Sequence, residues 1–123
     1  MRFFTRKLVL PQHLNAGNTL FGGQCLAWID EEAAIVAITQ MGTPRIVTRK
    51  ISEVNFLAPA YQGDIIEIGV AATKQGLTSA TFSVIVRNKM TQRTIVEIAE
   101  IVFVALDEEG KPCTHLLSIQ TKE

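Results

Sequence analysis

A polar, glycine-rich loop leads directly into an apolar segment that carries a single out-of-place carboxylate. The loop contains Asn15 and ends at Gly22 and Gly23, and Asp30 follows seven residues after the second glycine. At a helix N-terminus, glycines leave the backbone N–H groups open to approach, and these groups suit a developing oxyanion. A carboxylate can remove a proton from water or attack a carbonyl carbon. These residue types together predict chemistry at a carbonyl group.

The position of Asp30 depends on a helix that we predict over residues 22–40. The polar side chains of this helix gather on one broad, solvated face, and they are those of Gln24, Glu31, Glu32 and Thr39. Asp30 projects onto the opposite half, beside Ala33 and Ala37, where an ionised group is costly unless something uses it. We therefore predict a functional role for Asp30, with a purely favourable contact to the helix dipole as the alternative.

The remaining elements that must position this helix are strands. We predict one strand over 2–10, then the loop 12–19, and after the helix four strands over 46–56, 64–73, 78–88 and 95–106. The last is so apolar that we expect a central strand covered on both faces. The set predicts an α+β fold in which a curved antiparallel sheet of about five strands wraps one central helix. At this length, 1–123 is expected to be a single domain.

Composition restricts the partners. Twelve basic and twelve acidic residues cancel, so neither nucleic acid nor a membrane surface is an expected partner. The chain has no apolar run near the roughly 20 residues that cross a bilayer, and no signal-peptide core, so we expect a cytoplasmic protein. Cys25 and Cys113 lack CxxC spacing and nearby histidines, which argues against a metal site. Both are predicted to be reduced packing residues, although a helix N-terminus could activate Cys25.

The ordered motifs resemble those of the hotdog-fold acyl-CoA thioesterases. The matching positions, between about residues 8 and 110, are Pro11, Asn15, Phe21-Gly22-Gly23, Asp30, Asn55-Phe56, Pro59 and Gly63-Asp64. The resemblance implies hydrolysis of fatty or short acyl-CoA, with Asp30 and Asn15 catalytic and no cofactor beyond the coenzyme A of the substrate. Asp30 would act as general base or nucleophile. Asn15 would orient water or hydrogen-bond the carbonyl oxygen, unless it only shapes a turn.

The spacing along the helix also predicts an assembly. Gly23 and Asp30 are about 10 Å apart along the axis, at 1.5 Å per residue, so one helix cannot serve one carbonyl with both groups. If both are catalytic, the two come from different subunits of a two-fold dimer with composite sites. The resemblance implies the same arrangement, and Asn15 is then expected across the interface from Asp30. We expect such homodimers to assemble further, to a tetramer or a hexamer.

Substrate contacts are less marked in the sequence. Small residues on the Asp30 side of the helix leave space for an acyl channel or for close packing, and they are Gly23, Ala27, Ala34 and Ala37. Gly22 and Gly23 could likewise serve only close packing. For the phosphates of coenzyme A we predict Lys74 and Arg87 as partners, because both lie on strands that could reach a groove.

Three other functions fit parts of the pattern. A hydratase or dehydratase of the same fold would use His13 and Glu31, but Glu31 is about 100° from Asp30, toward the polar face. A non-catalytic acyl-CoA-binding or sensing module would bind without turnover, and such regulators need an output domain, which this chain does not show. A purely structural dimer would need none of the site residues.

Overall fold

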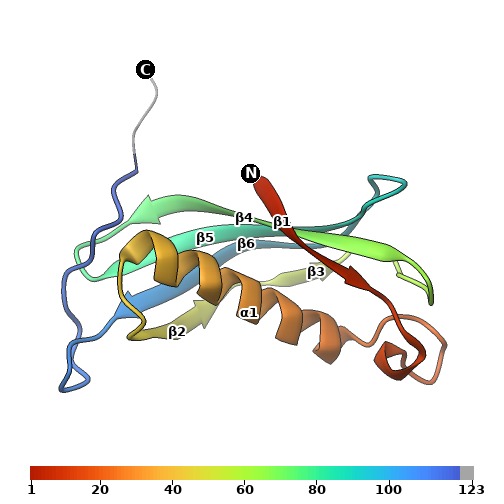
Figure 1. Ribbon diagram of the computed structural model, residues 1–123, viewed down its shortest axis with the longest axis horizontal. Coiled ribbons are helices and arrows are strands. Elements are labelled where there is room, and N and C mark those ends of the chain that lie inside the picture. Colours follow the sequence, from red (N-terminus) through yellow and green to blue (C-terminus); the bar gives the residue numbers. More distant parts are fainter. Residues whose placement is uncertain (120–123) are drawn as a thin grey trace.

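The computed structural model describes residues 1–119, in which one long helix lies against one antiparallel sheet (Figure 1). Strand β1 (Arg2–Leu8) and the short 3-10 helix η1 (Pro11–His13) precede the central helix α1 (Gly22–Met41). The strands that follow are β2 (Ile46–Ile51), β3 (Val54–Phe56), β4 (Ile65–Gln75), β5 (Ser79–Asn88) and β6 (Thr94–Ala105). The predicted α+β arrangement, with a curved sheet around one helix, is confirmed.

The sheet has six strands rather than about five. Its order is β1-β4-β5-β6-β2, and β3 also pairs with β6, so that β2 and β3 together form one edge. The predicted strand 46–56 is broken at Ser52, whose N–H donates to the Glu100 carbonyl and whose hydroxyl accepts from the Glu100 N–H. β6 is covered less than predicted, because Glu97 and Ala99 on its outer face are exposed.

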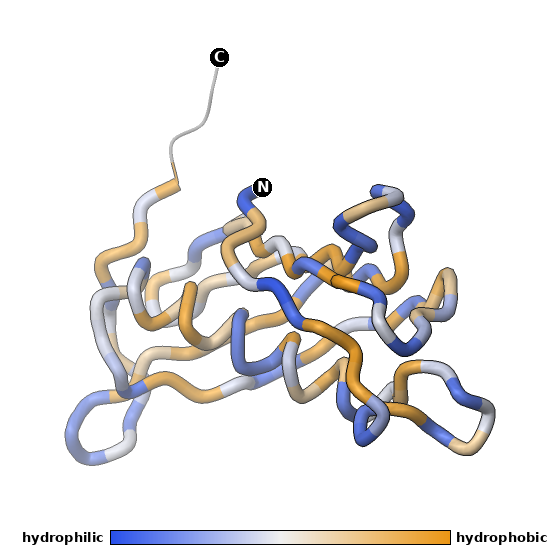
Figure 2. The backbone as a smooth tube through the Cα atoms, turned by 45° about the vertical axis from the view of Figure 1, so that its right-hand side comes forward, coloured by the Kyte–Doolittle hydropathy of each residue, from blue (hydrophilic) through white to orange (hydrophobic). Residues whose placement is uncertain are grey.

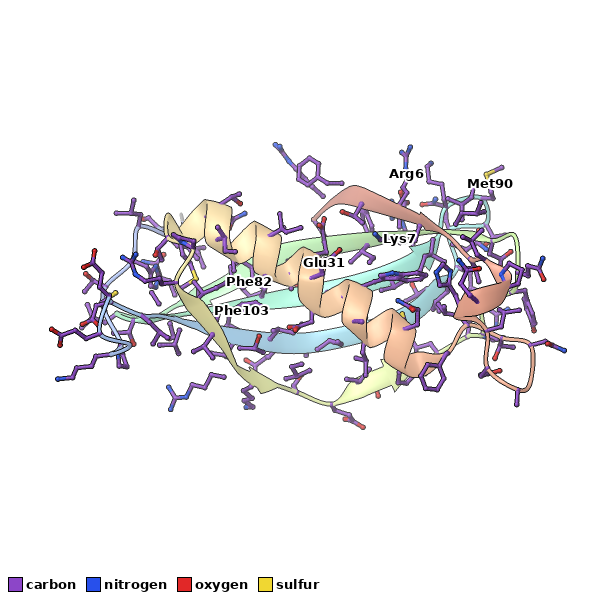
Figure 3. The ribbon with its side chains drawn as sticks, turned by 60° about the horizontal axis from the view of Figure 1, so that its bottom comes forward. Arg6, Lys7, Glu31, Phe82, Met90 and Phe103 are labelled. Atoms are coloured by element: carbon purple, nitrogen blue, oxygen red, sulfur yellow. The ribbon has the colours of Figure 1, made fainter. Side chains whose placement is uncertain are left out.

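The hydrophobic core fills the space between α1 and the sheet. The helix residues that enter it recur every four positions and are at most 1% exposed: Cys25, Ile29, Ala33, Ala37 and Met41. Beneath the C-terminal half of α1, Phe82 and Phe103 pack edge to face with ring centroids 5.9 Å apart (Figure 3). Figure 2 shows that the turn over 107–111, by contrast, is hydrophilic. The core therefore fixes which side of α1 faces the sheet.

Two carboxylates on α1 differ in their exposure from what the sequence predicted. Glu32, placed on the solvated face, is only 6% exposed, whereas Asp30, placed on the apolar half, is exposed in the single chain. The centre of the buried face runs through Ile29 and Ala33, so Asp30 and Glu32 flank it on opposite sides. In the isolated chain Asp30 therefore carries no burial cost, and the prediction of such a cost is wrong.

The described residues end in an extended segment after β6. The Leu116 N–H donates to the Met41 carbonyl at 3.0 Å, and the His115 ring lies 2.6 Å, through Nε2, from the Ser79 carbonyl oxygen. This segment thereby closes over the C-terminal end of α1. The prediction of a single domain over 1–123 includes residues 120–123, which lie outside the described residues, so it stays a prediction. Within residues 1–119, no helix is both long enough and apolar enough to cross a membrane.

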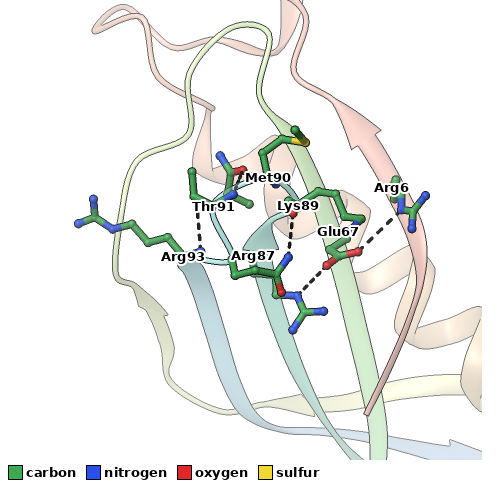
Figure 4. Close-up of polar contacts among 9 residues, drawn as sticks. Arg6, Glu67, Arg87, Lys89, Met90, Thr91 and Arg93 are labelled. Atoms are coloured by element: carbon green, nitrogen blue, oxygen red, sulfur yellow. Dashed lines mark hydrogen bonds and ion pairs between the residues drawn. The ribbon is translucent and has the colours of Figure 1, made fainter.

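A buried carboxylate fastens β1 to the rest of the sheet. Glu67 on β4 is 2% exposed, accepts a hydrogen bond from Arg87 Nε at 2.7 Å, and lies 3.8 Å from Arg6 Nε on β1 (Figure 4). The Arg87 guanidinium also stacks 3.6 Å from the centre of the Phe3 ring. Burial raises the pKa of Glu67, but the hydrogen bond from Arg87 and the charges of Arg87, Lys89 and Arg6 outweigh it and hold this pKa below its ordinary value.

This depressed pKa makes the stability of the fold depend on pH. Because the folded pKa of Glu67 is the lower one, its contribution is present above the unfolded pKa and is lost as pH falls through the folded pKa. We expect Glu67→Gln to lower the free energy of unfolding by about 1–3 kcal/mol at neutral pH, and the deficit to shrink as the medium is acidified. Urea unfolding at several pH values measures this. Glu97→Gln, at an exposed carboxylate, is the control, and a deficit independent of pH would contradict the prediction.

Candidate active site

The side chain of Asn15 holds the loop that precedes α1. Its Oδ1 accepts hydrogen bonds from the Gly17 N–H at 2.9 Å and the Thr19 N–H at 3.1 Å, and its Nδ2 donates to Thr19 Oγ1 at 3.0 Å. The turn-shaping role that the sequence left open for Asn15 is therefore present. An amide carries two N–H hydrogens, so the second Nδ2 hydrogen stays available to a ligand. The structural and the catalytic role are compatible.

Helix α1 begins with open backbone donors. Phe21 at the N-cap makes no side-chain capping bond, and the first helical hydrogen bond runs from the Cys25 N–H to the Phe21 carbonyl at 3.1 Å. Within residues 1–119 the N–H groups of Gly22 and Gly23 have no acceptor. With the positive end of the helix dipole, such unpaired donors form a site for an anion or an oxyanion.

Two aromatic rings explain why glycine occupies these positions. A Cβ at Gly22 would lie 3.3 Å from the Phe56 ring, and a Cβ at Gly23 would lie 2.7 Å from the Phe21 ring. The rings of Phe21 and Phe56 therefore rest close to the start of α1. The glycines permit this packing and leave the N–H groups unobstructed by side chains of their own, so the packing role does not conflict with an oxyanion role, which stays a prediction.

Asp30 lies on the side of α1 that faces β2. Its Oδ1 accepts a hydrogen bond from Thr48 Oγ1 at 3.2 Å, and both residues are exposed. Thr48 is a site residue that the sequence analysis missed, because nothing in the segment 46–51 distinguishes it. Only the pairing of β2 at the sheet edge beside α1 brings it to the carboxylate, and its hydroxyl then orients Asp30.

A single chain does not assemble all the predicted site residues. In the part of the chain that the structure describes, no hydrogen bond joins Asp30 to Asn15, which bonds within its own loop. Helix α1 is continuous from Gly22 to Met41, so the axial separation of Gly23 and Asp30 of about 10 Å is fixed. The structure thus brings Asn15 together with Gly22 at one end of α1 and leaves Asp30 two turns away.

A cavity of about 390 Å³ opens beside the start of α1. Its lining includes the polar residues Asn15 and Thr19, the backbone of Gly22, and the apolar residues Cys25, Ala60 and Ile95. No lining residue carries a charge. This cavity therefore joins the open end of the helix to a groove of uncharged, mostly apolar side chains.

The thiol of Cys25 is not a nucleophile in this cavity. Cys25 is 1% exposed, and burial raises its pKa to about 12. The thiolate, which is the reactive form, is therefore scarce at neutral pH. Cys25 and the half-buried Cys113 are both free cysteines, which agrees with their predicted packing role.

The small residues near Asp30 do not line this cavity. Ala37 is fully buried in the core, whereas Gly23 and Ala27 are exposed and Ala34 is half-buried along the flank of α1 that carries Asp30. Their small side chains leave the outside of the helix accessible to a neighbouring molecule. Of the two interpretations, close packing against another helix therefore has more support than an acyl channel.

The two cations assigned to coenzyme A are engaged on the sheet. Lys74 Nζ lies 3.1 Å from the Glu100 carboxylate, and the hydrogen bond and charge of Lys74 hold the pKa of Glu100 below its ordinary value. Arg87 is bonded to Glu67. Neither cation lines the cavity beside α1. The assignment of Lys74 and Arg87 to phosphate binding stays a prediction.

The residues of the hydratase alternative are not paired. His13 Nδ1 accepts a hydrogen bond from the Leu10 N–H at 3.0 Å, and its ring packs edge-on against Trp28 with centroids 4.7 Å apart. Glu31 is exposed on α1 (Figure 3), and among residues 1–119 no hydrogen bond joins it to His13. In the same residues, no group of three or more His, Cys, Asp and Glu is placed to hold a metal ion.

Comparisons with known proteins agree on one family. The family model described as the thioesterase superfamily matches residues 17–95. An uncharacterized acyl-CoA thioester hydrolase of Zymomonas mobilis is 32% identical over 88% of this chain and 74% of the relative. The hexameric thioesterase y2039 from Yersinia pestis superposes with a TM-score of 0.85 at 29% identity, over 96% of this chain and 97% of that one. The acyl-CoA hydrolase of Staphylococcus aureus, solved with butyryl coenzyme A, has a TM-score of 0.84 at 33% identity, over 96% and 71%.

Proposed function

Because this chain belongs to the thioesterase superfamily, with the hotdog fold, we propose that it hydrolyses acyl-CoA thioesters to the free acid and coenzyme A. The observation that carries this proposal is the family match over 17–95, which spans the open N–H groups of Gly22 and Gly23 and the carboxylate of Asp30. Relatives named as acyl-CoA thioester hydrolases, and one solved with butyryl coenzyme A, supply the substrate class.

The open donors at the start of α1 fit the transition state of this reaction. As water attacks the thioester carbon, negative charge develops on the carbonyl oxygen, and the N–H groups of Gly22 and Gly23 with the free Nδ2 hydrogen of Asn15 stabilise it. Asp30 either accepts the proton of the attacking water or attacks the carbon itself, forming an anhydride that water then hydrolyses. In both routes the sulfur leaves as the thiolate of coenzyme A. Neither route uses a metal or a redox cofactor.

The exposed edge of the sheet supports a two-fold dimer with composite sites. Apolar side chains that are between 42% and 55% exposed gather on β2, on β3 and just after it, and they are Val47, Ile51, Phe56 and Leu57. An unpaired edge strand with such a surface is a docking site for a second chain. Antiparallel approach of two α1 helices, permitted by the small residues beside Asp30, places Asp30 of one protomer opposite Asn15 and Gly23 of its partner.

Assembly beyond the dimer follows from the relatives. Solved structures similar to this chain are described as hexameric, including that from Yersinia pestis. We therefore favour a hexamer of three dimers over a tetramer for this chain. A cytoplasmic location, and the lack of a nucleic-acid or membrane partner, stay predictions from composition.

Hydrolysis by the purified protein tests the proposed function. Wild-type protein incubated with acetyl-, butyryl-, hexanoyl-, decanoyl- and palmitoyl-CoA is expected to release one thiol and one acid per substrate, measured with a thiol reagent and by mass spectrometry. Binding of every acyl-CoA without thiol release would favour the sensing module instead. Addition of water to enoyl-CoA with the thioester intact would favour the hydratase.

A further inference from the structure

The walls of the cavity beside α1 are fixed by backbone hydrogen bonds. The segment between β3 and β4 is tied to β6, because the Leu57 N–H donates to the Ile95 carbonyl at 2.7 Å. The loop before α1 is tied to the same segment, because the Leu20 N–H donates to the Ala60 carbonyl at 2.8 Å. The cavity is open on the side of Phe56 and Leu57, which are exposed, and its floor is formed by buried residues that include Cys25 and Ile95. The hydrogen bonds hold this floor in place, so the depth of the cavity limits what enters.

The lining of the cavity selects an uncharged, apolar group. Its polar side chains, Asn15 and Thr19, belong to the loop next to the open N–H groups of Gly22. One helical turn further along α1, Cys25 is 1% exposed, and across from the helix Ile95 is 4% exposed. Phosphate groups would find no cation among the lining residues, so the nucleotide end of coenzyme A does not fit there.

We propose that this cavity receives the acyl chain of the substrate and that Cys25 determines the longest chain that enters. The proposal rests on the proposed hydrolase function: a thioester carbonyl bound at Gly22 has the sulfur on one side and the alkyl chain on the other. A chain directed inward passes Cys25. The volume of about 390 Å³ is near the lower end of the range of roughly 300–1,000 Å³ for small-molecule pockets, which suits a short or medium-length chain.

The dependence of the rate on chain length follows from this geometry. Each methylene that the cavity buries is expected to raise kcat/KM by about fourfold. Once the cavity is full, further methylenes meet the fixed wall, and kcat/KM falls. The neutral thiol of Cys25 takes no part in the reaction, so replacing it changes only the space available.

Cys25→Leu fills the cavity, and the series from acetyl- to palmitoyl-CoA measures the effect. We expect the maximum of kcat/KM to move to a shorter chain, and the ratio of kcat/KM for decanoyl-CoA to that for acetyl-CoA to fall at least about tenfold. Cys113→Leu makes the same replacement at a half-buried cysteine outside the cavity, and it is expected to leave this ratio unchanged. Ala58→Leu narrows the cavity from the segment after β3 and serves if Cys25→Leu does not fold.

Inhibition by free coenzyme A identifies which part of the substrate occupies the cavity. If the acyl chain does, the inhibition constant of coenzyme A stays unchanged in Cys25→Leu. An equal loss of kcat/KM at all chain lengths, with weaker inhibition by coenzyme A, would place the pantetheine there and overturn the proposal. Folded Cys25→Leu and Ala58→Leu proteins with the wild-type chain-length profile would also overturn it. A wild-type protein that hydrolyses no acyl-CoA would instead overturn the proposed function, which separates the two failures.

Discussion

Asp30→Asn is expected to lower kcat for acyl-CoA hydrolysis by about 10²- to 10⁴-fold with the fold intact. The amide that replaces the carboxylate can neither accept the proton of water nor attack the thioester carbon. The fold is expected to persist because Asp30 is exposed, and the new side-chain oxygen can still accept the hydrogen bond from Thr48. Steady-state hydrolysis of butyryl-CoA gives kcat, and circular dichroism with thermal unfolding checks the fold.

The neighbouring carboxylate provides the matched control for this experiment. Glu31 is also exposed on α1 but points away from β2, and Glu31→Gln removes the same charge from the adjacent position. We expect Glu31→Gln to hydrolyse butyryl-CoA at the wild-type rate. Full activity of a folded Asp30→Asn protein would refute the role of Asp30. Loss of activity in Glu31→Gln alone would instead assign the acid–base role to Glu31, the acid of the hydratase alternative.

The fold was predictable where one local pattern determines an element. Apolar residues at helical spacing and the glycines at Gly22 and Gly23 predicted a helix over 22–40, and α1 spans 22–41. The break between β2 and β3 was not predictable. It depends on Ser52 and Glu100, which are far apart in the sequence and exchange hydrogen bonds only once β6 has paired. Helical periodicity likewise could not place Glu32, because the exact direction from which the sheet approaches α1 decides which flank is buried.

The site was predictable to the same degree. Two glycines before an apolar run and a carboxylate seven residues later stand out in the chain, so they could be selected as candidates, although Asp30 is exposed and not buried as its selection assumed. Thr48 and the cavity could not, since a threonine in a strand and an apolar lining are ordinary features of any core or edge. The exposure of Asp30 supports the proposed composite site, because a carboxylate that is open in one chain and two turns from the open N–H groups can face those of a second chain.

Complementation between two inactive variants tests the proposed composite site. In Asn15→Asp, Oδ1 can still accept the hydrogen bonds from Gly17 and Thr19, but the Nδ2 donor is replaced by a carboxylate oxygen that repels an oxyanion. Asn15→Asp and Asp30→Ala are each expected to be inactive as homodimers. A mixed dimer has one site with both changes and one site with neither. If equal amounts are refolded together and pair at random, about one quarter of the wild-type activity is expected.

The double variant, mixed in the same way with wild type, distinguishes composite sites from sites within one chain. Composite sites leave every mixed dimer inactive, because each of its sites contains one altered residue, and total activity is then about one quarter of that of wild type alone. Sites confined to one chain would leave the wild-type chain active in each mixed dimer, giving about one half, and would give no activity when Asn15→Asp and Asp30→Ala are mixed. Compared with composite sites, sites within one chain raise the expected activity of the double-variant mixture and abolish that of the mixture of Asn15→Asp with Asp30→Ala. Partial refolding lowers the activity of both mixtures, so it cannot imitate either pattern.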